Sequence, residues 1–232
     1  MTQNRADRHL RVLTTPRAAA LAGVLFALLF GTVLLLVRTT LPEHAEYGTQ
    51  WADSGRDRLK LAAVLMPFAG ITFLWFIGVV RDGFGRFEDK FFASVFLGSG
   101  LLFLAMTFSA TAVGVALSSS HAFTQDAAAH AEVVAFGQML MLTLTKTYAL
   151  RMAAVFMISL ATIWLKTGLM PRWLVGVTYL VALGLLVASD ISMWITMAFP
   201  VWVLMVSGLL LARAGLFEEL RTGGDGPTEP AR

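Results

Sequence analysis

Three charged side chains interrupt long apolar stretches of this 232-residue sequence: Lys146, Arg151 and Asp190. An ionised group in such surroundings is costly unless it has a partner or a ligand. Two cations and one carboxylate could form an ion pair or a small anion-binding pocket. Neighbouring hydroxyl groups would add donors to such a pocket, and they belong to Thr143, Thr145 and Thr147. A purely structural alternative is that Arg151 pairs with Asp190 while Lys146 extends toward water.

Three histidines form a second set of candidate ligands: His44, His121 and His130. Several acidic residues accompany them in the sequence, namely Glu43, Glu46, Asp126 and Glu132. Neutral imidazole and carboxylate groups together could bind zinc or another divalent ion. The spacing matches no compact metal-binding motif, however, and ordinary polar loops also contain such histidines. Apart from a divalent metal at these positions, the sequence predicts no cofactor.

The segment RDGFGRFEDK at residues 81–90 combines three acidic and three basic side chains and could bind a metal–phosphate group. It resembles part of the aspartate motif of CDP-alcohol phosphotransferases, but the alanine–arginine pair and the later paired aspartates of that motif are missing. A mixed-charge turn between two helices explains the segment better. No nucleophile elbow, zinc-protease or phosphate-loop motif occurs, and the chain has no cysteine. No catalytic residue is therefore predicted.

The composition places these residues in a membrane protein. Hydrophobic residues make up 57% of the chain and charged residues only 14%, and the mean hydropathy is +0.71. A soluble domain averages about 45–50% apolar and ~25% charged residues. The formal net charge of +3 is too small to indicate nucleic-acid binding. We therefore expect an all-α protein whose main partner is the lipid bilayer.

Six membrane spans are predicted, because a hydrocarbon core ~30 Å thick requires about 20 apolar helical residues. They cover residues 18–37, 61–80, 91–117, 147–166, 173–189 and 191–212. Pro16 suits the first helical position, with Thr15 as its N-cap. The apolar stretch 133–145 is too short for a separate span, and it could be re-entrant, interfacial or an extension of the following helix.

Lysine and arginine predict the orientation of the chain. They are concentrated in the N-terminal tail at 1–17 and in the loops 81–90 and 166–172, so both termini are expected in the cytoplasm. The transmembrane domain would cover residues 18–214, followed by a disordered polar tail at 215–232. No inverted repeat is visible between the two halves of the sequence.

Small residues predict which helix faces pack closely, since lipid gives helices no hydrophobic reason to associate. The first span carries such residues at every fourth position: Ala19, Gly23, Ala27 and Gly31. The third span has a similar series that begins at Ser94 and Gly98 and continues through Ala105, Ser109 and Ala112. Both faces are expected to be buried, either inside the bundle or between copies of the chain. A homo-oligomer or another membrane protein is therefore a possible partner.

Four segments resemble an uncharacterised multi-pass membrane protein family of actinobacteria: PFAGITFLWFIGVVRD, FEDKFFASVFLGSGLLFLA, RMAAVFMISLATIWLKTGLMPRWL and FPVWVLMVSGLLL. The resemblance covers roughly residues 15–213. It implies a protein of the bacterial plasma membrane with several spans. The family has no assigned activity, so the resemblance transfers no site residue.

The sequence thus predicts a six-helix bundle in the bacterial plasma membrane that binds or passes a small ion or solute. Lys146, Arg151 and Asp190 would form its polar site. One alternative is a non-transporting scaffold or accessory subunit of a membrane complex. A second alternative is a lipid-modifying enzyme at the membrane surface, which only residues 81–90 support. The spans contain scattered serine and threonine residues rather than the continuous polar stripe typical of a pore.

Overall fold

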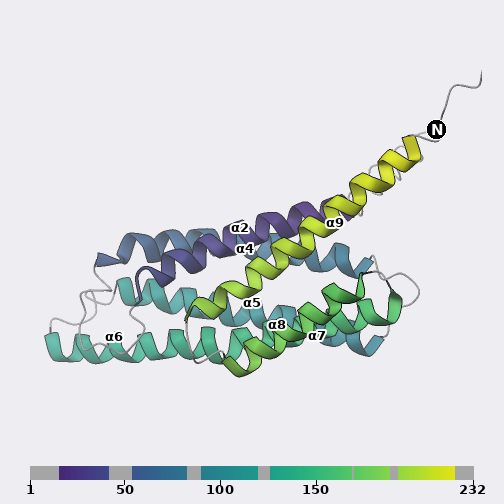
Figure 1. Ribbon diagram of the computed structural model, residues 1–232. Helices are drawn as coiled ribbons and strands as arrows, with labels where there is room; N and C mark the ends of the chain where they lie inside the picture. Colours follow the sequence, from purple (N-terminus) through teal and green to yellow (C-terminus); the bar gives the residue numbers. More distant parts are fainter. Residues whose placement is uncertain are drawn as a thin grey trace, which may run out of the picture.

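The computed structural model describes residues 16–41, 54–82, 90–119, 126–168, 170–188 and 193–222, and this part of the chain is helical without strands (Figure 1). The elements are α2 (Pro16–Arg38), α4 (Arg56–Asp82), α5 (Lys90–Ser118), α6 (Ala127–Leu142), the π-helical segment η3 (Thr143–Ala149), α7 (Leu150–Thr167), α8 (Arg172–Ala188), the 3-10 turn η4 (Met193–Met197) and α9 (Ala198–Thr222). The bounds of α2, α4, α5 and α8 follow the predicted spans within a few residues, whereas the helix through α6, η3 and α7 begins well before residue 147 and α9 ends after residue 212. Asp190 lies outside the described residues, and α9 continues past residue 215, where the disordered tail was expected to begin.

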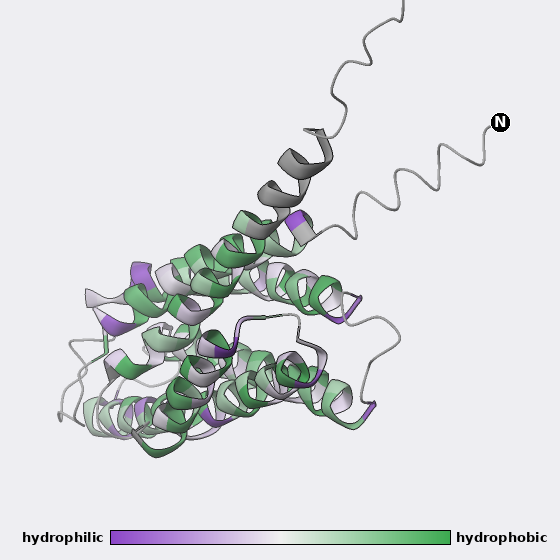
Figure 2. Cartoon of the chain, turned by 45° about the vertical axis from the view of Figure 1, so that its right-hand side comes forward, coloured by the Kyte–Doolittle hydropathy of each residue, from purple (hydrophilic) through white to green (hydrophobic). Residues whose placement is uncertain are grey.

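Five helical stretches are long and apolar enough to cross a membrane, and the sixth, in α8, is shorter. The five long stretches cover residues 17–38, 56–82, 90–118, 127–167 and 194–212. Their outward-facing positions carry large hydrophobic side chains, among them Leu28, Trp75, Phe136 and Leu180, which are 57%, 67%, 70% and 73% exposed. Hydrophobic residues run along the helices and many hydrophilic ones lie near helix ends (Figure 2). Such a surface indicates a multi-pass membrane protein.

The stretch 133–145 extends the following span as helix, because α6, η3 and α7 join without a break. Together they form a helix of 41 residues, which at ~1.5 Å per residue is about 60 Å long. The join is marked by η3, where the backbone N–H of Leu150 donates to the carbonyl of Thr145, five residues back. A turn of this kind is wider than an α-helical turn and is frequent at functional sites.

The helices form two layers (Figure 1). One layer contains α9, α2 and α4, in which α2 lies between the other two. The second contains α5, α7 and α8, with α7 in the middle and α6 beside α5. Successive spans run antiparallel, so the bundle has two ends. The Arg38 end holds the last residue of α2 and the first of α4, and the Lys90 end holds the first residue of α5 and the last of α7.

The packing of the first three spans resembles that of the last three. The central helix α2 packs against α4 and α9, and the central helix α7 packs against α8 and α5. Exchanging α2 with α7, α4 with α8 and α5 with α9 therefore reproduces the neighbours of the two central helices, although α4 packs extensively on α5 whereas α8 and α9 hardly touch. Since α2 and α7 run in opposite directions, this is the pattern of two halves with inverted topology. The symmetry exists in the packing, although no repeat is visible in the sequence.

Aromatic rings fill the space between the two layers. The cluster contains Phe26, Phe30, Phe73, Phe76, Phe96, Phe103, Phe156, Trp164, Phe199 and Trp202. Phe103 of α5 lies 4.7 Å from Phe199 of α9 between ring centroids. Phe73 of α4 also lies 5.3 Å from Phe156 of α7. These contacts join one layer to the other near the middle of the bundle.

The two small-residue faces have different environments. On α2, Ala19, Gly23 and Ala27 are buried inside the bundle, whereas a side chain at Gly31 would meet no atom within 4 Å. On α5, Ser94 is exposed and Gly98 likewise has open space beside it. The buried face of α5 instead carries its aromatic residues. In the single chain, therefore, the α5 series does not face the bundle.

Substituting Gly23 with leucine should destabilise the protein, because a side chain there would collide with Ser207 of α9 and Phe76 of α4. Overpacking of this kind costs about 1–3 kcal/mol. Gly31→Leu is the matched control on the same helix and should unfold close to the wild-type temperature. Thermal unfolding in detergent measures both variants. Equal unfolding temperatures for the two would contradict the packing described for α2.

Candidate functional site

The segment η3 places a group of polar residues in the middle of the longest helix. Its sequence, TLTKTYA, alternates β-branched threonines with other residues. Such threonines lower the α-helical preference of the chain. The widened turn puts Thr145 and Lys146 on the side that faces the opposite layer, while Tyr148 is exposed on the outside. The predicted polar site is therefore built around a local departure from α-helical geometry.

A cavity opens between the two layers at the Arg38 end of the bundle. Its empty volume is about 360 Å³, and we name it the basic cavity. It is lined by Leu34, Val37, Arg38, Leu41, Met141, Leu142, Thr145, Lys146 and Thr196. Two of these side chains are cations and none is acidic. The cavity therefore has a positive lining on an otherwise mostly apolar wall.

The two cations are held differently. The guanidinium carbon of Arg38 lies 5.2 Å from the centre of the Trp194 ring, a cation–π contact that orients the side chain at the mouth of the cavity. Lys146 is half-buried. Its ammonium group forms no hydrogen bond or ion pair with the residues that the structure describes. Lys146 is thus a cationic donor available to a ligand in the cavity.

The hydroxyl of Thr145 is a second available donor. Most helical serine and threonine side chains here donate to a carbonyl one turn back, as Thr107 does to Phe103 at 3.0 Å. Thr145 makes no such bond to any described residue. It lines the basic cavity directly beside Lys146.

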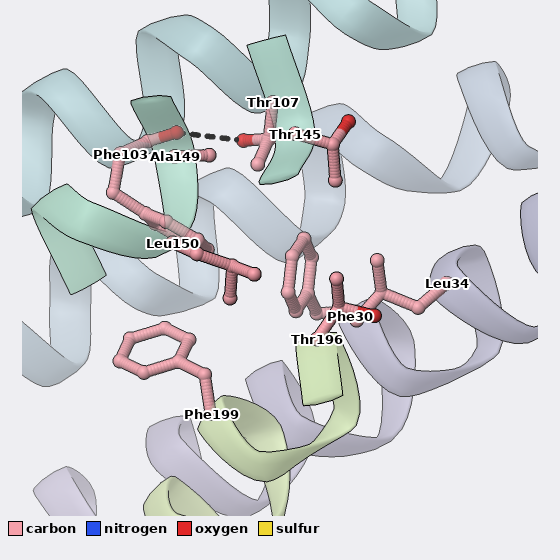
Figure 3. Close-up of a pocket in the computed structure, with 9 residues that line it drawn as sticks. All are labelled: Phe30, Leu34, Phe103, Thr107, Thr145, Ala149, Leu150, Thr196 and Phe199. Atoms are coloured by element: carbon pink, nitrogen blue, oxygen red, sulfur yellow. Dashed lines mark hydrogen bonds between the residues drawn. The ribbon is translucent and has the colours of Figure 1, made fainter. Parts of the chain in front are cut away.

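A second cavity continues from the first toward the middle of the bundle (Figure 3). Its empty volume is about 220 Å³, and we name it the aromatic cavity. The residues that line it are Phe30, Leu34, Phe103, Thr107, Thr145, Ala149, Leu150, Thr196 and Phe199. Three of them, Leu34, Thr145 and Thr196, also line the basic cavity. The two cavities adjoin, and the rings of Phe103 and Phe199 stand at the deeper one.

Arg151 lies on a different face of the helix from Lys146. It lines neither cavity, and its guanidinium donates to the carbonyl of Thr147 at 2.8 Å. Half-buried residues continue its face through Val155, Ile158 and Thr162. Thr162 is hydrogen-bonded to Tyr179 of α8 at 2.7 Å. The face of Arg151 is therefore the one that packs on α8.

Arg151 lies toward the middle of the bundle rather than at its end. Its neighbour Leu150 lines the same cavity as Phe103, which is close to the middle of α5. The helix begins at Ala127, well before residue 147, where the span was expected to begin. Arg151 therefore lies far from the end of this helix. An arginine at this level in a membrane is expected to need a counter-charge.

Asp190, the predicted partner of Arg151, lies outside the described residues, and only the register of α7 and α8 is described. Thr162 is level with Tyr179. Because the two helices are antiparallel, residues an equal number of positions before Thr162 and after Tyr179 lie at the same level. Ala153 is therefore level with Ala188, the last residue of α8. Asp190 follows Ala188 after a single residue. The end of α8 therefore lies close to the level of Arg151, and the pair of Arg151 with Asp190 stays a prediction.

The candidate metal ligands do not form a site among the described residues. His130 is buried in α6, whereas His44, His121 and residues 83–89 lie outside the part of the chain that the structure describes. Within the described ranges, no group of three histidine or acidic side chains could hold a metal ion.

Arg38 is the main residue of the site that the sequence analysis did not single out. Its position does not distinguish it from other cations that flank spans, and such cations usually report orientation. Trp194 was missed for a related reason, since tryptophan is common near the ends of spans. The signal available in the sequence was weak: three hydroxyl residues surround Lys146, and Thr196 lies near the start of the last span.

Comparison with known proteins gives no match: no protein-family model, curated protein or solved structure matches the chain. The function is therefore argued from the geometry alone.

Alanine at Arg151 or at Asp190 should lower the unfolding temperature in detergent, because each change leaves the other charge alone in the bundle. A lone charge at the centre of a membrane helix costs roughly 2–3 kcal/mol on insertion scales. The double variant should recover part of the loss. Thermal unfolding of the two single variants and the double variant tests this coupling. Strictly additive losses would show that the two residues do not interact.

Proposed function

We propose that the protein is a carrier of a small solute in the bacterial plasma membrane. The solute would enter the basic cavity from outside and bind near Lys146 and Thr145. The two layers would then move relative to each other about the aromatic cluster, closing the Arg38 end and opening the Lys90 end. The sequence analysis expected that the protein binds or passes a small ion or solute. The proposal adds that passage occurs by alternating access and not through a continuous pore.

The observation that carries the proposal is the inverted arrangement of the two halves around an interlayer cavity. Carriers built from inverted repeats bind their substrates at the interface of the repeats, and they work by rocking one unit against the other. The basic cavity lies between the layers at one end. At the other end, Gly23 packs against Ser207, and Trp164 lies 6.3 Å from Trp202 between ring centres. A cavity at one end and close packing of these residues at the other are what one state of a carrier requires.

The same packing argues against an open pore. The two cavities lead to Phe103 and Phe199, whose rings are in contact. Beyond them the aromatic cluster occupies the interlayer space. A hydrated ion would find no polar groups there to replace its water shell.

The orientation of the carrier is tested by single cysteines introduced into the naturally cysteine-free chain. Cysteines at Thr2, Gly85 and Thr228 should react with a membrane-impermeant maleimide only from the cytoplasm. Cysteines at Gly48 and Ser119 should react only from outside. This result would place the basic cavity on the outer side. Labelling of Gly85 from outside would reverse the orientation or change the number of spans.

Motion of the layers is tested by spin labels placed across the basic cavity. Val37 of α2 and Leu142 of α6 line it from opposite layers. The distance between labels at these positions should have two populations in proteoliposomes, one for each state of the cavity. The matched control is the pair Thr39 and Arg58, which join α2 to α4 within one layer at 3.2 Å. Labels on the control pair should give one narrow distance.

A single, narrow distance for the Val37 and Leu142 pair under all conditions would contradict a carrier. A second test uses cysteines at the same pair joined by a short reversible cross-linker. Joining them should hold the Arg38 end closed, so a spin-label pair placed across the Lys90 end should keep only the longer distance of its open state.

A scaffold remains the second candidate function, and one observation favours it. The small residues of α5 face outward, where another helix could approach closely. They are Ser94, Gly98, Ala105, Ser109 and Ala112. A rigid basic cavity together with a stable complex containing a second membrane helix on this face would favour the scaffold.

A further inference from the structure

We infer that the basic cavity is a binding site for a small monovalent inorganic anion of about the size of a halide ion. The inference rests on the proposed function, since it names the class of solute that the carrier would take. It is argued from the charge, the available donors and the size of the cavity.

The charge of the lining selects the sign of the ligand. Arg38 of α2 and Lys146 of η3 reach the cavity from opposite layers, and none of the described residues that line it is acidic. The charge of Lys146 acts strongly on a ligand there, because apolar walls lower the effective dielectric constant. An anion beside Lys146 would be attracted, whereas a cation would be repelled. The site therefore discriminates by sign before any hydrogen bond is formed.

The available donors supply specific contacts to such an anion. The ammonium group of Lys146 and the hydroxyl of Thr145 make no bond to the described residues and adjoin each other on the widened turn. In a regular helix the threonine would ordinarily donate to the carbonyl one turn back, as Thr107 does. Charge-assisted hydrogen bonds from these two groups are the strong kind. Together they can replace part of the water shell of an anion.

The size of the cavity limits the ligand to a few atoms. The empty volume of about 360 Å³ includes space open to the outside, and the enclosed part admits only objects about the size of a water molecule. A halide ion is only slightly larger than a water molecule. A tetrahedral oxyanion such as phosphate would need the walls to separate. The deeper aromatic cavity offers no further charge, so the anion is expected to stay beside Lys146 and Thr145.

Bromide is a suitable probe, because it resembles chloride and can be located by its anomalous X-ray scattering. Bromide should raise the unfolding temperature of the full-length protein in detergent, relative to gluconate at the same ionic strength. Isothermal titration should give a saturable affinity that is about tenfold weaker in Lys146→Gln. Thr145→Val, which removes the hydroxyl without changing the charge, should also weaken binding. Bromide in crystals should lie between Arg38 and Lys146.

Lys166→Gln is the matched control. Lys166 lies at the Lys90 end, 4.6 Å from the ring of Phe92, and lines neither cavity. This variant should bind bromide as the wild type does. If Lys146→Gln and Lys166→Gln lose affinity equally, or neither loses any, the assignment of the site is overturned. Stabilisation by phosphate but not by bromide would overturn the size argument.

The outcomes separate this inference from the proposed carrier. Specific bromide binding together with a single interlayer distance would keep the anion site and reject the carrier. Two interlayer distances without bromide binding would keep the carrier and reject the anion. Bromide that shifts the two distance populations in the wild type, and fails to do so in Lys146→Gln, would support both.

Discussion

The packing of aromatic rings between the two layers is the interaction on which the rest of the structure depends. Lipid is as apolar as the helix surfaces, so the layers gain little from hiding hydrophobic residues and are held by close contact instead. Rings such as Phe103 and Phe199 provide that contact at mid-depth. They also block the cavity that descends from the Arg38 end. Ring contacts require no fixed hydrogen-bond geometry, so they can hold two layers together while permitting a change in their relative tilt.

Most of the fold could be predicted from the sequence, because hydropathy and span length are properties of short segments. The predicted spans 18–37, 61–80 and 91–117 match α2, α4 and α5 within a few residues. The extension from 133 to 145 could not be decided. Residues 127–167 contain no proline that would mark a helix end. A helix that extends out of the hydrocarbon core also has the same local pattern of apolar residues as a helix that lies at the interface. The orientation of the chain in the membrane stays a prediction.

Less of the candidate site could be predicted, since it depends on how faces and layers are oriented. Lys146 and Arg151 were grouped because they are close in sequence, but residues five apart in a helix point in different directions, about 140° apart in an ideal α-helix. Lys146 accordingly faces the interlayer cavity, and Arg151 faces α8. Arg38 comes from the opposite layer, a juxtaposition that no local pattern contains. For a similar reason the sequence left open whether the small residues of α5 face the bundle or another chain: lipid and protein interior are both apolar, so composition does not distinguish them.

The asymmetry between the two halves explains why the basic cavity lies at the Arg38 end. Under the exchange that relates them, α4 corresponds to α8, yet α4 has 27 residues and α8 has 17. The longer helix covers the full height of its layer, whereas the shorter one ends level with Ala153, well before the Arg38 end. The chain then returns through η4, and the space beside Thr196 is left to the cavity rather than to a helix. At the Lys90 end both layers are complete, and Gly23 allows α2 and α9 to meet closely. Unequal second helices in the two halves thus leave room for the basic cavity at the Arg38 end, with Lys146 beside it.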